Sequence, residues 1–530
     1  MNFVNNILRG VKMRSIFFVI LILSQTLFAQ FYPNSYQFKN ENLSKFSDFT
    51  PASNSIQDII ASDNLIILGT SQGLSLSEDN GENWTNFYQS EPFGEDGSTA
   101  IGYKNGTIWA TTGKTTVVNG EYLPEGTGIK YSLDNGTTWT SIPQPIDDPG
   151  DSSIIYGVNN IRALPITTTY NNISYDIAFT KNTVWIASFA GGLRKSTDMG
   201  ITWERVVLPP DNLDSISPND ILDFTLQPVA GKFGQESWLN HRVFSVLGVN
   251  DSTLYVGTSG GINKSTDNGI SWKKFNHQNQ ANPISGNFVV GFGFNEADNS
   301  IWAATWKAED QDEYWAVSRS TDGGENWKTT LPNEQAHNFG FKYLDDGGSH
   351  VFIPTNNGIY RSNDNGISWV EPSEIKDALT NVSIETNIFY SAASNKTNTS
   401  DFNIWVGSHN GLARLSETNG FWEGDWKVYI VPTALKEKTS TLNNEFALAQ
   451  NYPNPFNPST TFSFTIPNSE FVTLSIYNSI GEKVASVVEK YLNSGTYSFN
   501  WTAKNLSTGI YFAHLISGND IQIRKILLLK

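Results

Sequence analysis

Residues 265–272 read STDNGISW, and four of these eight positions recur five more times along the chain with identical spacing. Consecutive copies lie 42 to 69 residues apart, near the period of β-propeller blades. Asp and Ser side chains can accept backbone N–H bonds inside a turn, Gly permits positive φ, and Trp buries a large ring. The repeat is therefore expected to be a structural turn. Its copies are Ser77, Asp79, Gly81, Trp84; Ser132, Asp134, Gly136, Trp139; Ser196, Asp198, Gly200, Trp203; Ser265, Asp267, Gly269, Trp272; Ser320, Asp322, Gly324, Trp327; and Ser362, Asp364, Gly366, Trp369.

Short β-favouring runs surround every copy and predict a four-stranded antiparallel unit. Around the copy at 265–272 these runs are 241–247, 253–258 and 261–265, separated by Gly, Asn, Asp and Ser. The second run of most units carries a large aromatic residue, which predicts either a sugar-stacking ladder or a core between blades. Because the position recurs whatever the neighbouring loops do, we favour the core. These aromatic residues are Trp109, Trp185, Tyr255, Trp302, Phe352 and Trp405.

Counting units rather than perfect motifs gives seven. After Trp405 the pattern continues through Ser416 and Glu417, with Trp422 or Trp426 in the Trp position, as a degenerate seventh copy. We predict an all-β chain in which residues 51–432 form a seven-bladed β-propeller. Within the N-terminal segment at 30–50, residues 46–49 are a candidate ring-closing strand, in competition with residues 426–430.

Composition excludes several classes of function. A formal net charge of −17 argues against nucleic acid binding, because phosphate recognition needs a basic patch. The chain contains no Cys, which excludes disulfides, thiolate metal sites and Cys nucleophiles. Its six His residues show no short ligand spacing. We therefore predict neither a metal nor a cofactor.

Residues 1–29 have the pattern of an export signal. Arg9, Lys12 and Arg14 precede an apolar run at 16–23, and small and polar residues follow. The run is too short to span a bilayer, which needs about 20 residues. We predict an exported mature chain that begins near Gln30 and has no transmembrane span.

The repeated motif resembles the Asp-box (BNR) repeat family, whose members include sialidases, sortilin-type receptors, xyloglucan hydrolases and photosystem assembly factors. The resemblance covers about 380 residues. It implies a β-propeller, but the activities of the family differ widely, so fold does not dictate function here.

The C-terminal region carries a second resemblance. Residues 448–460 read LAQNYPNPFNPST, and Gly481, Trp501, a GIYF string at 509–512 and a basic-apolar end at 524–527 follow. Alternating runs at 461–466 and 473–477 predict a small β-sandwich at 445–530. This segment resembles the type A sorting domain of the type IX secretion system of Bacteroidetes-like bacteria. The resemblance implies outer-membrane translocation, then release or attachment to the cell surface, with residues 433–444 as the linker.

No catalytic constellation stands out. A sialidase would need three Arg to hold a carboxylate, but only Arg162, Arg205 and Arg242 lie outside the recurrent position before the motif, and the first two blades contain no Arg. A xyloglucanase-like hydrolase would need a carboxylate pair across a cleft. With 52 acidic residues a pair can always be nominated, so the catalytic residues stay unassigned.

Irregular loops indicate where a ligand would bind. In a four-stranded meander the motif turns share one face with the turns between first and second strands, and long loops on the opposite face are the usual binding elements. Irregular segments occur at 112–128, 143–172 and 208–240. The densest mixture of rings and acids, which suits a carbohydrate or a cationic partner, comprises Trp306, Glu309, Asp310, Asp312, Glu313 and Tyr314.

These observations predict an exported cell-surface or secreted propeller that binds a glycan or protein partner without catalysis and reaches its destination through the type IX machinery. The alternative is a carbohydrate-active glycoside hydrolase, sialidase-like or xyloglucanase-like, on the same ring.

Overall fold

The computed structural model describes residues 34–37, 47–118, 120–233, 237–397, 401–418, 420–431, 446–451, 453–478, 482–504, 506–518 and 520–529. The chain divides into two compact units, Met1–Val431 and Pro432–Lys530. The predicted signal peptide at 1–29 and linker at 433–444 lie outside the described residues.

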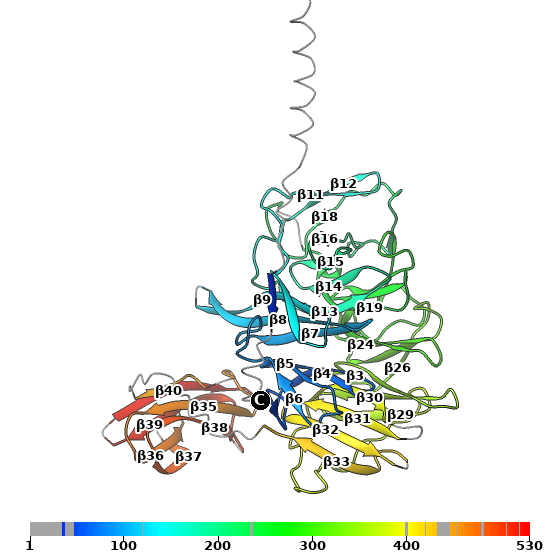
Figure 1. The fold of residues 1–530 in the computed structure, drawn as a ribbon. Coiled ribbons are helices and arrows are strands. Elements are labelled where there is room, and N and C mark those ends of the chain that lie inside the picture. Colours follow the sequence, from blue (N-terminus) through cyan, green and yellow to red (C-terminus); the bar gives the residue numbers. More distant parts are fainter. Residues whose placement is uncertain are drawn as a thin grey trace, which may run out of the picture. The chain divides into compact units, whose positions relative to one another are not determined.

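The first unit is a β-propeller. Within its described residues, seven antiparallel sheets are each built from strands that follow one another in the chain. The first strands of successive sheets pack together, and β3 of the first sheet contacts β30 and β31 of the last, where blue lies beside yellow in Figure 1. The ring is thus closed by contact between the first and last blades.

The blades have the following strands, each from the innermost outward. Blade one contains β3 (Ile56–Ser62), β4 (Leu65–Thr70), β5 (Gly73–Ser77) and β6 (Trp84–Asn86); blade two contains β7 (Gly97–Lys104), β8 (Thr107–Val118), β9 (Glu121–Ser132) and β10 (Thr138–Ile142); and blade three contains β13 (Ser174–Phe179), β14 (Val184–Ser188), β15 (Gly192–Ser196) and β16 (Glu204–Arg205). Blade four contains β19 (Val243–Gly248), β20 (Leu254–Thr258), β21 (Gly261–Ser265) and β22 (Trp272–Phe275), and blade five contains β23 (Phe288–Asn295), β24 (Ser300–Trp306), β25 (Ala316–Ser320) and β26 (Lys328–Thr330). Blade six contains β27 (Gly340–Tyr343), β28 (Ser349–Thr355) and β29 (Gly358–Ser362), and blade seven contains β30 (Phe389–Lys396), β31 (Phe402–Ser408), β32 (Gly411–Glu417) and β33 (Gly424–Tyr429).

All six motif copies form the same hydrogen-bonded turn. The Ser hydroxyl donates to Asp Oδ1 at 2.7–2.9 Å and accepts the Gly N–H at 2.8–2.9 Å. The residue before the Trp, always Asn, Ser or Thr, donates its side chain to Asp Oδ2 at 2.5–2.8 Å. Partial burial alone would raise the pKa of these Asp residues, but for all six the hydrogen bonds outweigh it and hold the pKa below its usual value.

The Gly and Trp of a motif turn also contact the preceding blade. A Cβ on Gly81 would lie 2.6 Å from the ring of Trp405, and Gly81 has φ +80°, so only Gly fits there. Trp84 meets Trp405 edge-on at 6.3 Å between centroids, and both rings are buried. The second-strand aromatic residues therefore form the core between blades rather than a sugar ladder.

The seventh motif copy has a different role. Leu415 pairs with Ile404 as Ser77 pairs with Ile66, which places Glu417 at the Asp position and Trp422 at the Trp position. Glu417 forms ion pairs with Arg361 and Lys342 of blade six instead of closing its own turn. The degenerate copy thus ties the last two blades together.

Some segments differ from the sequence-based predictions. The segment at 112–128 is not an irregular loop but part of the long β8–β9 hairpin. In the predicted ring-closing segment, β2 (Ser47–Asp48) pairs with β6 of blade one, and Trp426 of the competing segment lies in β33 of blade seven. β1 (Asn34–Gln37) adds to β10.

The two long connections around blade three form a small accessory sheet. It consists of β11 (Ser153–Tyr156), β12 (Asn159–Ala163) and β18 (Thr225–Leu226), while β17 (Ser215–Ile216) adds to β22 and η2 (Leu239–His241) precedes β19. Asp147, within the irregular segment at 143–172, is buried between Arg194 and Arg205, at 2.7 and 3.1 Å. The connection is therefore anchored by a buried ion triad.

The second unit is a β-sandwich. One sheet contains β34 (Ala447–Leu448), β35 (Ser459–Ile466) and β38 (Gly495–Thr502); the other contains β37 (Lys483–Leu492), β36 (Glu470–Tyr477), β39 (Gly509–Ser517) and β40 (Asp520–Leu528). Inward-facing residues of both sheets, such as Phe462, Leu474 and Leu515, form one core.

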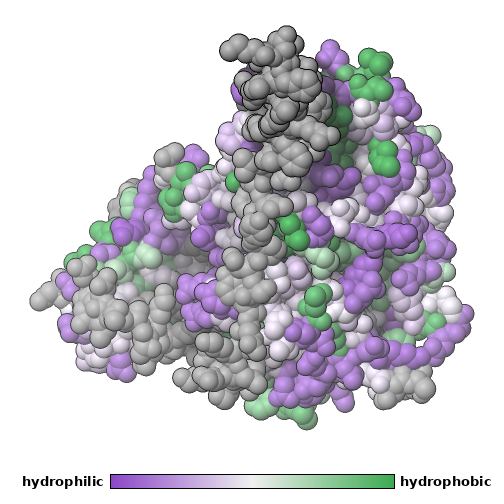
Figure 2. All heavy atoms as spheres, turned by 45° about the horizontal axis from the view of Figure 1, so that its top comes forward, coloured by the Kyte–Doolittle hydropathy of each residue, from purple (hydrophilic) through white to green (hydrophobic). Residues whose placement is uncertain are grey.

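Hydrophilic residues cover most of the described surface on the face shown in Figure 2, and the hydrophobic ones form small separate patches. Among the described residues, no helix has the length and apolar character that a membrane crossing requires.

Candidate functional site

The innermost strands of the propeller share one irregularity. In six blades the pairing with the second strand skips one residue near the start of the first strand, which is a β-bulge. In blade six, Ala336 pairs with Thr355 and Gly340 with Phe352, which leaves one extra residue as well. The seven bulge residues are Gln57, Thr99, Tyr175, Phe244, Val290, His337 and Tyr390.

These bulges lie at the end of the channel opposite to the motif turns. Ile56, beside the first bulge, pairs with Thr70 at the β4–β5 turn, whereas the backbone N–H of Asn80 in the motif turn donates to Asn64 O in the β3–β4 turn at 3.1 Å. This confirms the prediction that the motif turns lie on the same face as the turns between first and second strands, opposite to the turns between second and third strands.

A chain of aromatic rings follows the bulge end of the channel from blade three to blade seven. Successive ring centroids lie 5.3, 4.5, 5.9, 5.5, 5.3 and 6.2 Å apart. The rings are only partly buried; Tyr175, for example, is 37% exposed. This aromatic arc consists, in order, of Tyr175, Phe244, Phe288, Trp306, His337, Tyr390 and His409.

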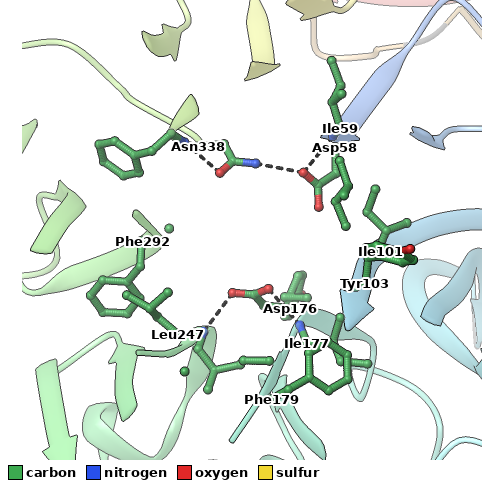
Figure 3. Close-up of a pocket in the computed structure, with 18 of the residues that line it drawn as sticks. Asp58, Ile59, Ile101, Tyr103, Asp176, Ile177, Phe179, Leu247, Phe292 and Asn338 are labelled. Atoms are coloured by element: carbon green, nitrogen blue, oxygen red, sulfur yellow. Dashed lines mark hydrogen bonds between the residues drawn. The ribbon is translucent and has the colours of Figure 1, made fainter. Parts of the chain in front are cut away.

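Below the arc, three polar side chains point into a cavity of about 680 Å³ in the channel. Asp58, Asp176 and Asn338 each follow a bulge residue, in blades one, three and six. Asn338 Nδ2 donates to Asp58 Oδ1 at 2.9 Å, and both Asp58 and Asp176 point into the same space in Figure 3. The three positions are equivalent in the repeat and lie on the channel wall directly after the bulges; we call them the channel floor, and the cavity continues past them to Lys104 and Asp251.

The floor carboxyls also accept backbone N–H groups. Asp58 Oδ1 accepts from Ile59 at 2.9 Å, and the two oxygens of Asp176 accept from Ile177 and from Val246 of the next blade, both at 2.8 Å. Each carboxyl retains lone pairs toward the cavity, because a carboxylate offers about four acceptor positions.

Burial makes both acids weaker than usual. Desolvation raises the pKa of Asp58 to about 6, although the hydrogen bonds from Ile59 and Asn338 oppose the rise. Desolvation raises the pKa of Asp176 to about 7; the Val246 N–H opposes this rise, and the negative charge of Asp58 adds to it. Displaced pKa values of this kind are typical of functional sites, although structural acids also show them.

The predicted loop residues divide into three groups: a ring of the arc, a set of exposed acids, and two residues that form hydrogen bonds within the fold. Trp306 belongs to the aromatic arc, and its Nε1 donates to Ala336 O at 2.8 Å. Glu309, Asp310 and Asp312 are exposed, and Glu309 and Asp310 line a separate hollow of about 340 Å³.

Glu313 and Tyr314 each form hydrogen bonds with other residues of blade five and its loops. Glu313 was expected to be an exposed acid, but it is only 4% exposed and accepts from Asn287 Nδ2 at 2.7 Å and from the N–H of Ala308 at 2.6 Å. The Tyr314 hydroxyl donates to Thr329 Oγ1 at 3.2 Å. The buried Glu313 therefore stabilises the conformation of the loop through these hydrogen bonds.

Of the residues that form the arc and the channel floor, only Trp306 was predicted from the sequence as a binding residue. The available signal was a polar residue inside an apolar first strand: the runs at 56–59, 174–177 and 336–339 read IQDI, SYDI and AHNF. In the part of the chain that the structure describes, no group of His, Asp and Glu is arranged to hold a metal ion.

Comparison with known proteins adds evidence mainly for the C-terminal unit. Residues 450–529 match the family described as secretion system C-terminal sorting domain. A domain of this family directs type IX secretion, so the chain is exported and then secreted or held at the cell surface. The family covers the tail alone and leaves the propeller unassigned.

The propeller has distant relatives. Xyloglucanase Xgh74A of Acetivibrio thermocellus is 26% identical over 248 residues, which cover 43% of this chain and 25% of that protein. The chain thus spans about a quarter of the curated relative.

Two solved structures are similar at low identity. PorZ, a surface component of the type IX secretion system of Porphyromonas gingivalis, has 12% identity and a TM-score of 0.38 and covers 90% of this chain and 66% of its own. YCF48 bound to D1 peptide has 14% identity and a TM-score of 0.40, with coverages of 75% and 97%.

Proposed function

We propose that the chain is an exported Asp-box propeller that binds a glycan or protein partner, without catalysis, at the aromatic arc and the channel floor beneath it. The observation that carries this proposal is the arc itself. Seven partly exposed rings follow one mouth of the channel across five blades, and four of them are at bulge positions, where the fold requires only the backbone geometry. Aromatic rings above a concave floor with a few fixed polar groups are typical of ligand sites.

In this proposal the two units have different functions, ligand binding and sorting. Residues 51–432 supply the ligand site, and residues 445–530 act as a type A sorting domain that the type IX machinery recognises. Deleting residues 445–530 should leave the propeller folded but retained in the periplasm, because the two units have separate cores. Fractionation of a type IX-competent host would measure this, and normal surface delivery of the truncated chain would contradict it.

Binding is tested on the full-length chain with a glycan array and with capture of surface proteins from the host. The matched variants are Trp306→Ala and Trp315→Ala: both rings lie in the same part of blade five, but only Trp306 belongs to the arc. Trp315 is 39% exposed. We expect Trp306→Ala to lose the captured ligand and Trp315→Ala to keep it; equal retention by both variants would contradict the arc as the site.

A glycoside hydrolase on the same ring is the second candidate, because the floor holds two carboxyls whose pKa is raised. A carboxylic acid that is protonated near neutral pH can act as a general acid. The similarity to a xyloglucanase over part of the propeller is compatible with this activity. Hydrolysis of a xyloglucan or other β-glucan that disappears in both Asp58→Asn and Asp176→Asn would establish it; binding without turnover favours the first proposal.

A further inference from the structure

We infer that the aromatic arc binds an uncharged saccharide chain of several units, which lies along blades three to seven with its hydroxyl groups toward the channel floor. This inference rests on the proposed function of the arc as the ligand site and specifies the chemistry of its ligand.

The extent of the arc determines the length of the ligand. Its rings continue without interruption from Tyr175 to His409; in blade five, where the bulge residue is Val290, Phe288 and Trp306 supply them. The bulge positions of blades one and two hold Gln57 and Thr99, and no ring of these blades belongs to the arc. Thr99 is engaged in the fold, since its hydroxyl donates to Ser174 O at 2.6 Å. The apolar rim is therefore a long curved strip with a polar gap, not a closed collar. Such a strip matches an extended chain of linked units, each with a C–H-bearing face, better than a single small molecule.

The floor presents a mixture of acceptors and donors. Asp58 and Asp176 accept hydrogen bonds, while Asn338 can accept and donate. A sugar hydroxyl both donates and accepts, so it can satisfy either kind of group. Apolar stacking above a floor of this kind suits the two faces of a saccharide, which presents C–H groups to the rings and hydroxyls to the polar residues.

Charge argues against ionic ligands. The chain carries a formal net charge of −17, which disfavours an acidic polymer. A cation is also a poor match, because backbone N–H groups and Asn338 already compensate the floor carboxyls. Burial further raises the pKa of Asp58 to about 6 and that of Asp176 to about 7. Near pH 6 Asp58 is therefore about half ionised and Asp176 mostly protonated, so the floor presents less than one full negative charge to a basic peptide.

The test is calorimetric titration of the full-length chain at pH 6 with defined probes. The neutral probes are cellohexaose, xylohexaose, mannohexaose and maltohexaose, each with its monosaccharide. Hexagalacturonic acid is the anionic probe and hexalysine the cationic one. We expect at least one neutral hexasaccharide to bind and its monosaccharide to bind at least about tenfold more weakly, because a single unit covers few rings.

Variants then place the binding. Trp306→Ala and Tyr390→Ala should each weaken the hexasaccharide by about tenfold, and Trp315→Ala should leave its Kd unchanged. Thermal unfolding of each variant shows whether the fold is retained; if Trp306→Ala unfolds, the milder Tyr390→Leu and Tyr175→Leu replace it, Tyr175 being 37% exposed.

The outcomes separate this inference from the proposed function. Binding of hexalysine or hexagalacturonic acid alone, lost in the arc variants, would overturn the saccharide and keep the arc as a site. Saccharide binding that the arc variants leave unchanged would overturn both. Failure of every neutral hexasaccharide to bind at millimolar concentration would overturn the saccharide inference.

Discussion

The motif turns and the strand bulges both repeat around the ring, but only the motif turns repeat their side chains as well as their backbone geometry. Each motif turn repeats its side chains together with its backbone: each Asp accepts hydrogen bonds from the Ser and from the residue before the Trp, and the Gly N–H donates to the Ser. The bulges repeat the backbone alone, and their side chains range from Gln57 to Tyr390. Even the acids differ: hydrogen bonds from Ser368 hold the pKa of the motif Asp364 at about 2, whereas burial raises the pKa of Asp176, which follows a bulge, to about 7.

This difference separates structure from function within a repeat protein. A side chain that recurs in every blade does a task that every blade needs, which is to close a turn and pack against its neighbour. A position whose geometry recurs while its side chain varies is free to serve one ligand. The motif turns stabilise the ring, and the bulges are the positions at which a binding surface can be built.

The largest expected effect is on stability at a motif turn. Trp272 is 2% exposed and lies in the core that joins blades three and four. Trp272→Ala should lower the free energy of unfolding by about 3–5 kcal/mol, because it leaves a cavity. Chemical denaturation measures this, with Trp315→Ala as the exposed control. A variant that keeps its stability but loses ligand would show that the motif belongs to a site.

The degenerate seventh copy gives the next effect. Arg361 is fully buried and pairs with Glu417, so Glu417→Ala leaves a buried charge without its counterion. We expect a loss of about 3 kcal/mol. Glu82→Ala is the matched control, because Glu82 also bridges two blades, through Arg414 and Lys427, but is 55% exposed; its loss should cost less than about 1 kcal/mol. Equal costs would mean that the seventh copy is not a special joint.

Sequence could predict the motif turns but not the channel floor, for a physical reason. The turn of residues 265–272 is local: the donors and acceptors of its Ser and Asp side-chain hydrogen bonds all lie within eight consecutive residues. Asp176 becomes a floor residue only because a bulge in β13 shifts the pairing of that strand with β14, and no local pattern reports a shift in pairing. Glu313 looked exposed among acids, but a distant residue, Asn287, binds it.

The pH dependence of stability should separate the two kinds of acid. An Asp whose pKa is higher in the folded state favours folding at low pH, and this advantage is lost as pH rises through the folded pKa. Asp58 and Asp176 should therefore make the propeller less stable as pH rises from about 4 to about 7, by at most ~1.4 kcal/mol per pH unit for each group. Motif acids such as Asp364 contribute stability above their unfolded pKa of 3.8 and lose it only as pH falls toward 2.

Asp176→Asn removes one titrating group and should flatten the dependence between pH 4 and 7, whereas Asp364→Asn should leave the slope in that window unchanged. Urea denaturation at several pH values measures both slopes. Identical slopes in wild type and Asp176→Asn would show that the floor carboxyl is fully hydrated.

The smallest effect concerns the acidic loop after Trp306. Glu309, Asp310 and Asp312 are exposed, and replacing all three by Ala should change the free energy of unfolding by less than about 0.5 kcal/mol. Glu313 is left intact because its removal would leave the Ala308 N–H without its partner and would take one of its partners from Asn287. The loop continues from an arc residue, so we expect the triple variant to weaken ligand capture by the arc about two- to threefold, as measured by calorimetry. An unchanged Kd would confine the site to the rings and the channel floor, and a loss as large as that of Trp306→Ala would move its centre onto the loop.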